Sequence, residues 1–336
     1  MQTVFMYKKL RRKELNAVQQ RIGVSYPLPG SALNRLAEEF DVVLRDPKQQ
    51  NFAQWLEQYG PSFDGLITML SDPLNAEAIA KCRQLKAVAN YAVGYNNIDV
   101  AAAGAHGIQV MNTPDVLTET SADFAWALLM AAARRIAEGD VMTRAGEFTG
   151  WQPELLLGKD VFGSVLGIVG AGRIGQAVAA RARGFSMTVL YHNRQRLPEA
   201  LESQLGMEYV SLEQLLQQAD FVSLHCPLTP ETRHLISTEQ LAMMKTDSIL
   251  INTARGPVVD ELAMLDALQK GVIAGAALDV YEWEPNITQG LRELSKVVLA
   301  PHAASASRAT RETMAWMVTE DVAAVLAGKT PQNPVQ

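Results

Sequence analysis

The strongest constraint on the fold of this chain is a glycine-rich turn between a strand-like segment and a helix-like one. The turn Gly170-Ala171-Gly172-Arg173-Ile174-Gly175 follows an apolar run at 165–169 and precedes an Ala-rich stretch with helical periodicity. In that setting the first glycine makes a tight turn, the second lets the backbone approach a pyrophosphate, and the third lets the helix pack closely on the strand. The free N–H groups of the helix N-terminus add a favourable potential for phosphate. The pattern predicts a dinucleotide-binding unit, with a purely structural turn as the alternative.

The segments after the turn support this prediction, because they alternate between strand-like and helical patterns. Six strand-like runs lie at 165–169, 188–192, 221–225, 248–252, 274–279 and 297–300. Six strands joined by helices are what one dinucleotide-binding sheet requires.

The residues before the turn show a similar alternation. Strand-like runs lie at 4–7, 66–69, 87–90 and 109–111, with helical stretches such as 75–82 between them, which predicts a second parallel sheet. An apolar helix expected at 118–135 leads into the next domain, and a helical tail at 308–327 returns to the first. We therefore expect an α/β protein with two Rossmann-like doubly wound domains and a cleft between them. Residues 1–113 and 302–336 would form a flavodoxin-like substrate domain, and residues 114–301 an inserted dinucleotide-binding domain.

Composition and charge exclude several classes of protein. The chain has 336 residues, 48% of them hydrophobic, which is unlike a disordered protein and is enough for two packed cores. Its formal net charge of −6 makes nucleic acid and anionic membranes poor partners. The longest apolar run, 124–133, is short of the ~20 residues that a membrane span needs. A basic cluster at 8–13 follows the apolar run at 4–7, the reverse of a signal peptide, and two cysteines, Cys82 and Cys226, suit a reducing compartment, so we expect the cytoplasm.

The end of the second strand after the turn bears on the choice of dinucleotide. An acidic residue about twenty positions after the glycines would hold the ribose 2′-hydroxyl of NAD, and the sequence has none there. Neutral Asn193 stands at the strand end instead, followed by Arg194 and Arg196, either of which would bind a 2′-phosphate as a charge-assisted fork. We therefore expect NADP(H) to be preferred, with NAD(H) as the alternative if both arginines are simply solvated.

Three ionisable residues follow later strands, at the sheet edge where open α/β folds bind their ligands. Arg255 carries a planar cation suited to a carboxylate, and Glu284 and His302 form a potential acid–base pair in which the carboxylate orients the imidazole. Each residue taken alone also has a structural interpretation, as a surface ion pair, a solvated loop acid and a packed turn histidine. Together with the glycine turn they favour an enzyme.

Seven motifs spread along the chain carry a resemblance to a known family. They are Val93-Gly94-Tyr95, Asn112-Thr113-Pro114 with 117–120, the glycine turn, 225–229 with Glu231-Thr232, 254–261, 278–282 with Glu284-Pro285, and Pro301-His302. The chain resembles the D-isomer-specific 2-hydroxyacid dehydrogenases, and most of all the bacterial glyoxylate/hydroxypyruvate and 2-ketogluconate reductases.

The resemblance implies a role for each matching residue. The catalytic residues would be Arg255, His302 and Glu284 rather than Glu282. The backbone N–H groups of Val93 and Gly94 would hold the substrate carboxylate together with Arg255 and His302. The cofactor would lie against the glycine turn and against Thr118, Pro227, Thr232, Thr253 and Asp279. No metal is implied.

The family also implies a reaction and an assembly. We expect the NADPH-dependent reduction of a small 2-ketoacid (glyoxylate, hydroxypyruvate or 2-keto-D-gluconate) to the D-2-hydroxyacid. Domain motion would close the cleft, and a homodimer would form through the nucleotide domain. Trp151 would either reach the partner's active site, as in some reductases of this branch, or serve as an ordinary interface aromatic.

Two departures from the family pattern bear on the active site. Ala303-Ala304-Ser305 stands where Ile-Gly-Ser is usual, so the methyl group of Ala304 would crowd the nicotinamide. Asn96 stands where an aspartate is common, which changes the charge beside the carboxylate-binding loop.

Other interpretations of the chain stay open. His225-Cys226 lacks a second ligand pair with zinc-like spacing, so core packing and cofactor contact explain it better than a metal. His106, His192 and His234 receive no chemical role. Because a fold does not determine function, a dinucleotide-sensing, corepressor-like binding protein is the alternative to an enzyme. Within the enzymes, a phosphoglycerate or lactate dehydrogenase is the alternative.

Overall fold

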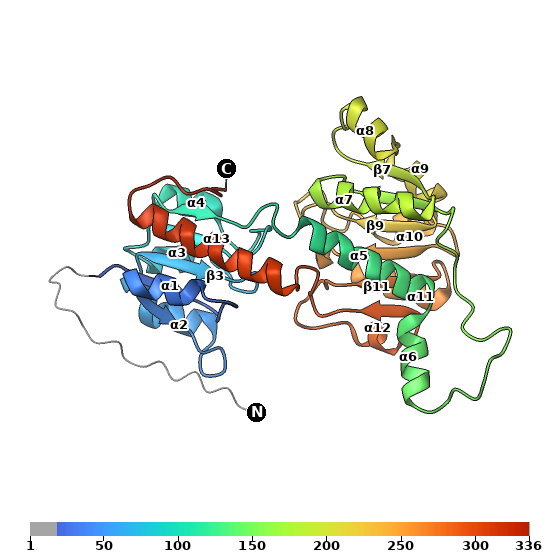
Figure 1. Ribbon diagram of the computed structural model, residues 1–336, viewed down its shortest axis with the longest axis horizontal. Helices are drawn as coiled ribbons and strands as arrows, with labels where there is room; N and C mark the ends of the chain where they lie inside the picture. Colours follow the sequence, from blue (N-terminus) through green and yellow to red (C-terminus); the bar gives the residue numbers. More distant parts are fainter. Residues whose placement is uncertain (1–18, 336) are drawn as a thin grey trace. The chain divides into compact units, whose positions relative to one another are not determined.

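The computed structural model describes residues 19–335, which divide into two compact units (Figure 1). Unit 1 is drawn from residues up to 91, from 97–111 and from 316 onward, and unit 2 comprises 92–96 and 112–315. We expected the second change of domain at 301/302. It falls instead within helix α13 (Arg308–Leu326), whose first residues pack with unit 2 and the rest with unit 1.

Unit 1 is built on a five-stranded, fully parallel sheet with the order β2-β1-β3-β4-β5. The strands are β1 (Arg21–Val24), β2 (Asp41–Leu44), β3 (Gly65–Thr68), β4 (Ala87–Asn90) and β5 (Gln109–Met111). This is the flavodoxin-like variant of the doubly wound fold. The strand predicted at 4–7 lies outside the described residues. Strands β1 and β2 were not predicted, because each is only four residues long and begins with a charged residue, so neither stands out as an apolar run.

The helices of unit 1 cover both faces of its sheet. They are α1 (Ala32–Glu39), α2 (Phe52–Tyr59), α3 (Ala76–Lys81), α4 (Val100–Ala105) and the later part of α13, with a 3-10 turn at Gly60–Ser62. The core on one face joins Trp55, Phe63 and Ile79 to Leu66 and Val88 of the sheet. Strands β3 and β4 are buried along their whole length, as expected for a parallel sheet covered on both sides.

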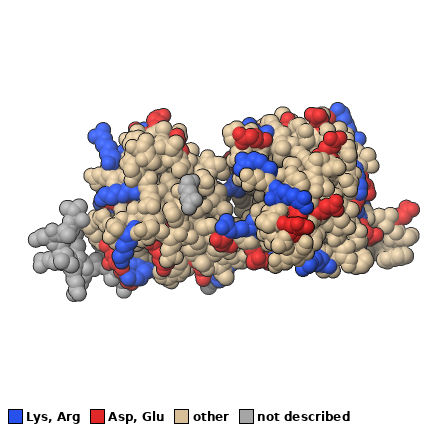
Figure 2. All heavy atoms as spheres, turned by 90° about the horizontal axis from the view of Figure 1, so that it is seen from above, with Lys and Arg blue, Asp and Glu red and all other residues tan. Residues whose placement is uncertain are grey.

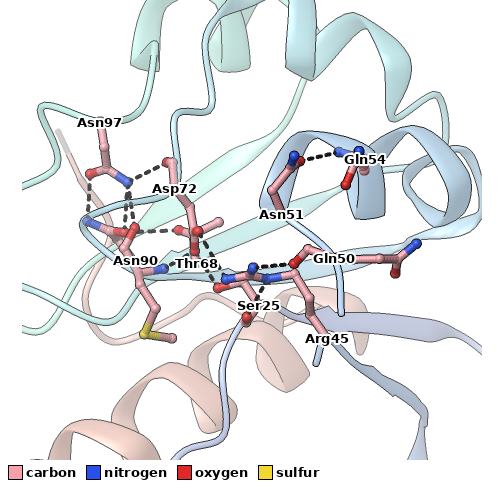
Figure 3. A network of polar contacts seen from close by, with 10 residues as sticks. Ser25, Arg45, Gln50, Asn51, Gln54, Thr68, Asp72, Asn90 and Asn97 are labelled. Carbon is pink, nitrogen blue, oxygen red and sulfur yellow. Dashed lines mark hydrogen bonds and ion pairs between the residues drawn. The ribbon is translucent and has the colours of Figure 1, made fainter. Parts of the chain in front are cut away.

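A buried polar network ties together the carboxyl ends of the central strands of unit 1 (Figure 3). Asp72 accepts hydrogen bonds from the Ser25 hydroxyl and from Met69 N, and lies 3.7 Å from the Arg45 guanidinium. Arg45 also donates to Ser25 O at 2.7 Å. Burial raises the pKa of Asp72 against the effect of these hydrogen bonds and of Arg45. The network satisfies polar groups that the sheet would otherwise leave unpaired in the interior.

Unit 2 contains a seven-stranded parallel sheet with the order β12-β11-β10-β9-β6-β7-β8. Its strands are β6 (Val165–Val169), β7 (Thr188–His192), β8 (Met207–Tyr209), β9 (Phe221–Leu224), β10 (Ile249–Asn252), β11 (Gly275–Leu278) and β12 (Val297–Leu299). Six of these were predicted from the sequence. The prediction of six strands was wrong by one, because edge strand β8 has three residues and an exposed glutamate at its centre.

Helices cover both faces of this sheet (Figure 1). They are α5 (Thr118–Ala133), α7 (Arg173–Ala182), α8 (Glu199–Leu205), α9 (Leu212–Gln218), α10 (Thr238–Met243), α11 (Glu261–Lys270) and α12 (Gln289–Glu293), with 3-10 turns at Arg183–Phe185 and Gly256–Val258. Helix α6 (Ile136–Arg144) follows α5 and buries none of its residues. Strand β10 shows the two faces clearly, since Ile249 and Ile251 join the core under α5 and α7 while Leu250 joins the core under α9 and α11. This alternation follows from the two-residue period of a strand. The sheet is therefore held in a fixed position between two packed layers.

The surface carries charges of both signs. On the face drawn in Figure 2, lysines and arginines are interspersed with aspartates and glutamates. Within residues 19–335, no helix combines the length and the apolar character needed to cross a bilayer.

Candidate active site

The glycine turn joins the end of β6 to the start of α7. Gly170 has φ +97°, and a Cβ atom there would lie 2.4 Å from Cys226 N, so residue 170 has room only for hydrogen. Gly172 caps α7, and no atom lies within 4 Å of where its Cβ would be, so the turn is open beside the helix N-terminus. In the first turn of the helix, Gly175 is buried and Ile174 packs against the apolar core. Arg173 is exposed and forms an ion pair with Asp115.

The residues expected to select the dinucleotide differ in their contacts. Asn193 accepts a hydrogen bond from Ala171 N at 2.7 Å, which ties the end of β7 to the glycine turn. Arg196 makes a two-point ion pair with Glu202, at 2.8 and 2.7 Å. Arg194 is exposed, and the described structure gives it no such carboxylate fork. Of the two arginines that the sequence offered for a 2′-phosphate, Arg194 is therefore the one without a two-point carboxylate partner, although its charge helps to lower the pKa of Glu231.

The other residues expected around the cofactor lie near strand ends. Thr253 follows β10, and its buried hydroxyl has no hydrogen-bond partner among the described residues. Thr232 donates to Pro227 O at 2.6 Å and accepts from Thr229 N at 2.8 Å, so its hydroxyl closes the loop after β9. Thr118 begins α5. The open turn at Gly172 and the unpaired hydroxyl of Thr253 fit a dinucleotide that lies across the carboxyl ends of the strands.

Arg255 lies against the loop expected to bind the substrate carboxylate. A Cβ atom on Gly94 would lie 1.8 Å from Arg255 Nη2, and Arg255 Nε donates to Asn96 Oδ1 at 3.2 Å. Val93 O accepts from Asn112 Nδ2 at 2.7 Å, which holds the same loop from the other side. Burial lowers the pKa of Arg255, while the Glu284 carboxylate opposes this shift. The structure thus brings Val93, Gly94 and Arg255 into one place.

Glu284 and His302, which the sequence suggests as an acid–base pair, are in contact. His302 Nδ1 lies 2.9 Å from Glu284 Oε2, and Tyr281 N donates to Glu284 Oε1 at 3.0 Å. Burial raises the pKa of Glu284, but the hydrogen bond to His302 and the nearby positive charges outweigh it, so the net shift is downward. His302 has φ +53°, a left-handed conformation that non-glycine residues seldom adopt and that is often found at functional sites.

Asp279 supports the backbone that follows His302. Its two carboxylate oxygens accept from Ala303 N at 2.7 Å and from Ala304 N at 2.8 Å. Burial raises its pKa, against these two hydrogen bonds and the charge of His302. The resemblance assigns Asp279 to the cofactor site, and these contacts also tie its carboxylate to the backbone beside His302.

The other residues singled out in the sequence range from buried to exposed. His225 Nε2 lies 2.8 Å from Ser223 Oγ, and burial lowers the pKa of His225 to about 4. Both cysteines are free and buried, which raises the pKa of each thiol to about 11. Across residues 19–335, the side chains include no group of three or more potential metal ligands. Trp151 is 84% exposed.

Comparison with known proteins places the chain in a family. The family model described as "D-isomer specific 2-hydroxyacid dehydrogenase, NAD binding domain" matches residues 126–304. A glyoxylate reductase from Korarchaeum cryptofilum is 50% identical over 320 residues, which is 95% of this chain and 96% of the relative. The chain belongs to the D-isomer-specific 2-hydroxyacid dehydrogenase family.

Two further members of the family extend the comparison. A glyoxylate reductase from Thermococcus kodakarensis is 48% identical over 95% of this chain and 96% of its own length. Among solved structures, an NADPH-dependent glyoxylate/hydroxypyruvate reductase from Sinorhizobium meliloti, in complex with NADP and malonate, has a TM-score of 0.83 and 33% identity, with 94% of this chain and 97% of that chain covered. As a D-2-hydroxyacid dehydrogenase, the protein is an oxidoreductase with a nicotinamide dinucleotide cofactor.

Both departures from the dehydrogenase pattern have a place in the structure. Asn96 is the hydrogen-bond acceptor for Arg255, a role that no pattern in the sequence indicated, because the two residues are 159 positions apart. Ala304 is 8% exposed, and its N–H donates to the Asp279 carboxylate at 2.8 Å.

Proposed function

We propose that this protein reduces small 2-ketoacids to D-2-hydroxyacids with NADPH, and that glyoxylate is a substrate. The observation that carries the proposal is the geometry of Arg255, Glu284 and His302 at the carboxyl edge of a dinucleotide-binding sheet. The names of the most similar relatives support glyoxylate, and the Sinorhizobium structure supports hydroxypyruvate and NADPH. The substrate 2-keto-D-gluconate rests on the sequence resemblance alone.

Each residue of the site has a part in the proposed reaction. Arg255 and the N–H groups of Val93 and Gly94 hold the substrate carboxylate, and Arg255 also polarises the keto oxygen. His302 donates a proton to that oxygen, and Glu284 stabilises the protonated imidazole before transfer. A nicotinamide held at this site would supply the hydride for the keto carbon. Gly170, Gly172, Thr253 and Arg194 would hold the dinucleotide.

The test is the consumption of NADPH and of NADH with glyoxylate, hydroxypyruvate and 2-keto-D-gluconate, followed by absorbance. We expect turnover with NADPH, and the ranking of kcat/KM identifies the substrate. His302→Ala should lower kcat by about 10²–10⁴-fold while dinucleotide affinity stays close to that of the wild type. Tight dinucleotide binding without turnover of any ketoacid would favour a sensing protein. Pyruvate and a phosphorylated 2-ketoacid are assayed in the same way, and turnover restricted to one of them would favour the alternative dehydrogenases.

We also propose a homodimer formed through unit 2. Helix α6 has no buried residue, and exposed apolar side chains continue along the following segment: Ile136, Val141, Phe148, Trp151, Leu157 and Phe162. So many exposed apolar residues within one segment support a protein interface.

A further inference from the structure

A second carboxylate, Glu282, lies two residues before Glu284 and is almost fully buried. Its side chain is 4% exposed, and its Oε1 lies 2.6 Å from His234 Nε2 and 3.1 Å from Arg233 Nη2. An ionised carboxylate only accepts hydrogen bonds, so in this pair His234 Nε2 is the donor. A solvated loop acid would not be buried in this way, because a buried carboxylate is costly unless it is paired and hydrogen-bonded.

Glu261, the first residue of α11, holds the same loop at two points. Its carboxylate accepts from Glu282 N at 2.8 Å and from Thr288 N at 3.0 Å. Glu282 in turn accepts from Glu261 N at 3.3 Å. The two glutamates therefore bind each other's backbone, and the loop 281–288 is fastened both near its start and at its end.

This fastened loop carries Glu284. Tyr281 N, next to Glu282 in the chain, donates to Glu284 Oε1, and Glu284 Oε2 contacts His302 Nδ1. The backbone of this loop therefore orients the Glu284 carboxylate. The Arg255 side of the site packs on the same backbone, since a Cβ atom on Gly256 would lie 1.9 Å from Tyr281 O. We propose that the contact between His234 and Glu282, together with Glu261, positions Glu284 against His302. His234 and Glu282 are thus positioning residues for the proposed reaction.

The physical reason lies in the exposure of the catalytic pair. The side chains of Glu284 and His302 are 35% and 30% exposed, so water competes for their hydrogen bond. A loop free to move would let Glu284 turn toward solvent, and His302 would then lose its nearest carboxylate. The other charged groups that face this pair are Asp279 and Arg255. Those facing Glu282 are Arg233, His234 and Glu261, all in unit 2.

The experiment compares His234→Ala with His234→Gln, in which a side-chain amide N–H replaces the imidazole donor. The first measurement is the pH profile of kcat/KM for glyoxylate with NADPH. We expect the basic limb in His234→Ala to move to lower pH by about 0.5–1 unit and kcat to fall roughly 10-fold to 100-fold. His234→Gln should restore part of both, and the dissociation constant of NADPH should not change.

The second measurement needs no turnover. The imidazole signal of His302, assigned by its loss in His302→Gln, is titrated by NMR in the protein alone. The midpoint in His234→Ala should move in the same direction as the basic limb. The proposal rests on the proposed function, but if the wild type reduced no ketoacid, this titration would still report the Glu284–His302 contact, so the two failures can be told apart.

Controls separate positioning from a loss of folding. If His234→Ala does not fold, Glu282→Gln takes its place, because glutamine keeps the shape of the side chain. It should show the shift of the basic limb and the fall in kcat expected for His234→Ala. Asp266→Asn, which removes an exposed ion pair with Lys270 on α11, should behave as the wild type. A fall in thermal stability with an unmoved basic limb and an unmoved His302 midpoint would show that the His234–Glu282 contact is only structural, and would overturn the proposal.

Discussion

Arg255 lies so close to Gly94 that residue 94 has no room for a side chain. In Gly94→Ala the new methyl group would occupy the position of Arg255 Nη2, which must move because the added carbon would lie 1.8 Å away. We expect kcat/KM for the ketoacid to fall by about 100-fold, mostly through KM, with NADPH affinity unchanged. Steady-state kinetics and a fluorescence titration of the dinucleotide measure the two effects.

A matched control for this substitution lies in unit 1. Gly104 is in α4, and no atom lies within 4 Å of where its Cβ would be. Gly104→Ala should therefore leave the kinetics unchanged. A Gly94→Ala enzyme with the wild-type KM would show that Arg255 does not hold the substrate where we place it.

The two arginines after β7 make a second prediction for single residues. Arg194→Ala should weaken NADPH binding about 10-fold and leave NADH binding unchanged, because its charge would meet only the 2′-phosphate. Arg196→Ala should change neither, since Arg196 is already paired with Glu202. Titrations of NADPH and NADH with both variants measure these effects. If Arg196→Ala weakens NADPH binding and Arg194→Ala does not, Arg196 is the residue that binds the 2′-phosphate.

At the scale of secondary-structure elements, Glu202 joins α8 to the strand β7 and the loop after it. It accepts hydrogen bonds from Arg196 and from the Tyr191 hydroxyl, which lower its pKa from 4.5 to about 2. A carboxyl group with a lowered folded-state pKa stabilises the fold above its unfolded value, and that contribution is lost as the pH falls toward the folded value.

Glu202→Gln should therefore be less stable than the wild type at neutral pH, and the difference should shrink as the pH falls from 4.5 toward 2. Thermal melts at several pH values measure this difference. Glu208→Gln, at an exposed residue in the middle of β8, is the control and should melt like the wild type throughout. A difference that did not depend on pH would mean that shape, rather than charge, accounts for the role of Glu202.

At the scale of the whole molecule, the proposed dimer predicts a particle of twice the 36.7 kDa chain mass. Val141→Asp combined with Trp151→Asp would place two charges among exposed apolar side chains and should give a monomer in light scattering. Leu262→Asp, which adds a charge at another exposed leucine of unit 2, should stay dimeric. Trp151→Ala tests the role of this side chain. If kcat falls while the dimer persists, Trp151 contributes to the partner's active site. If kcat is unchanged, Trp151 is an ordinary interface aromatic.

The sequence by itself determined the local features of this protein. It predicted the glycine turn, six strands of the larger sheet, and helices α5 and α13. It also predicted that Arg255, Glu284 and His302 lie at strand ends. These features depend on neighbouring residues, through apolar periodicity, the steric freedom of glycine and the rule that ligands meet the carboxyl ends of parallel strands. Short strands β1, β2 and β8 were missed, because their hydrogen bonds come from neighbours distant in the chain.

Tertiary structure alone decided which side chains meet. The contact of Asn96 with Arg255 joins residues 159 positions apart, and that of Glu282 with His234 joins residues 48 apart. It also separated two residues that look alike in sequence: Arg196 forms an ion pair with Glu202, whereas Arg194 forms no such pair within residues 19–335. Hydrogen bonds and ion pairs act only over a few ångströms. Which charges come within that distance depends on how the strand-end loops pack together, and spacing along the chain does not encode it.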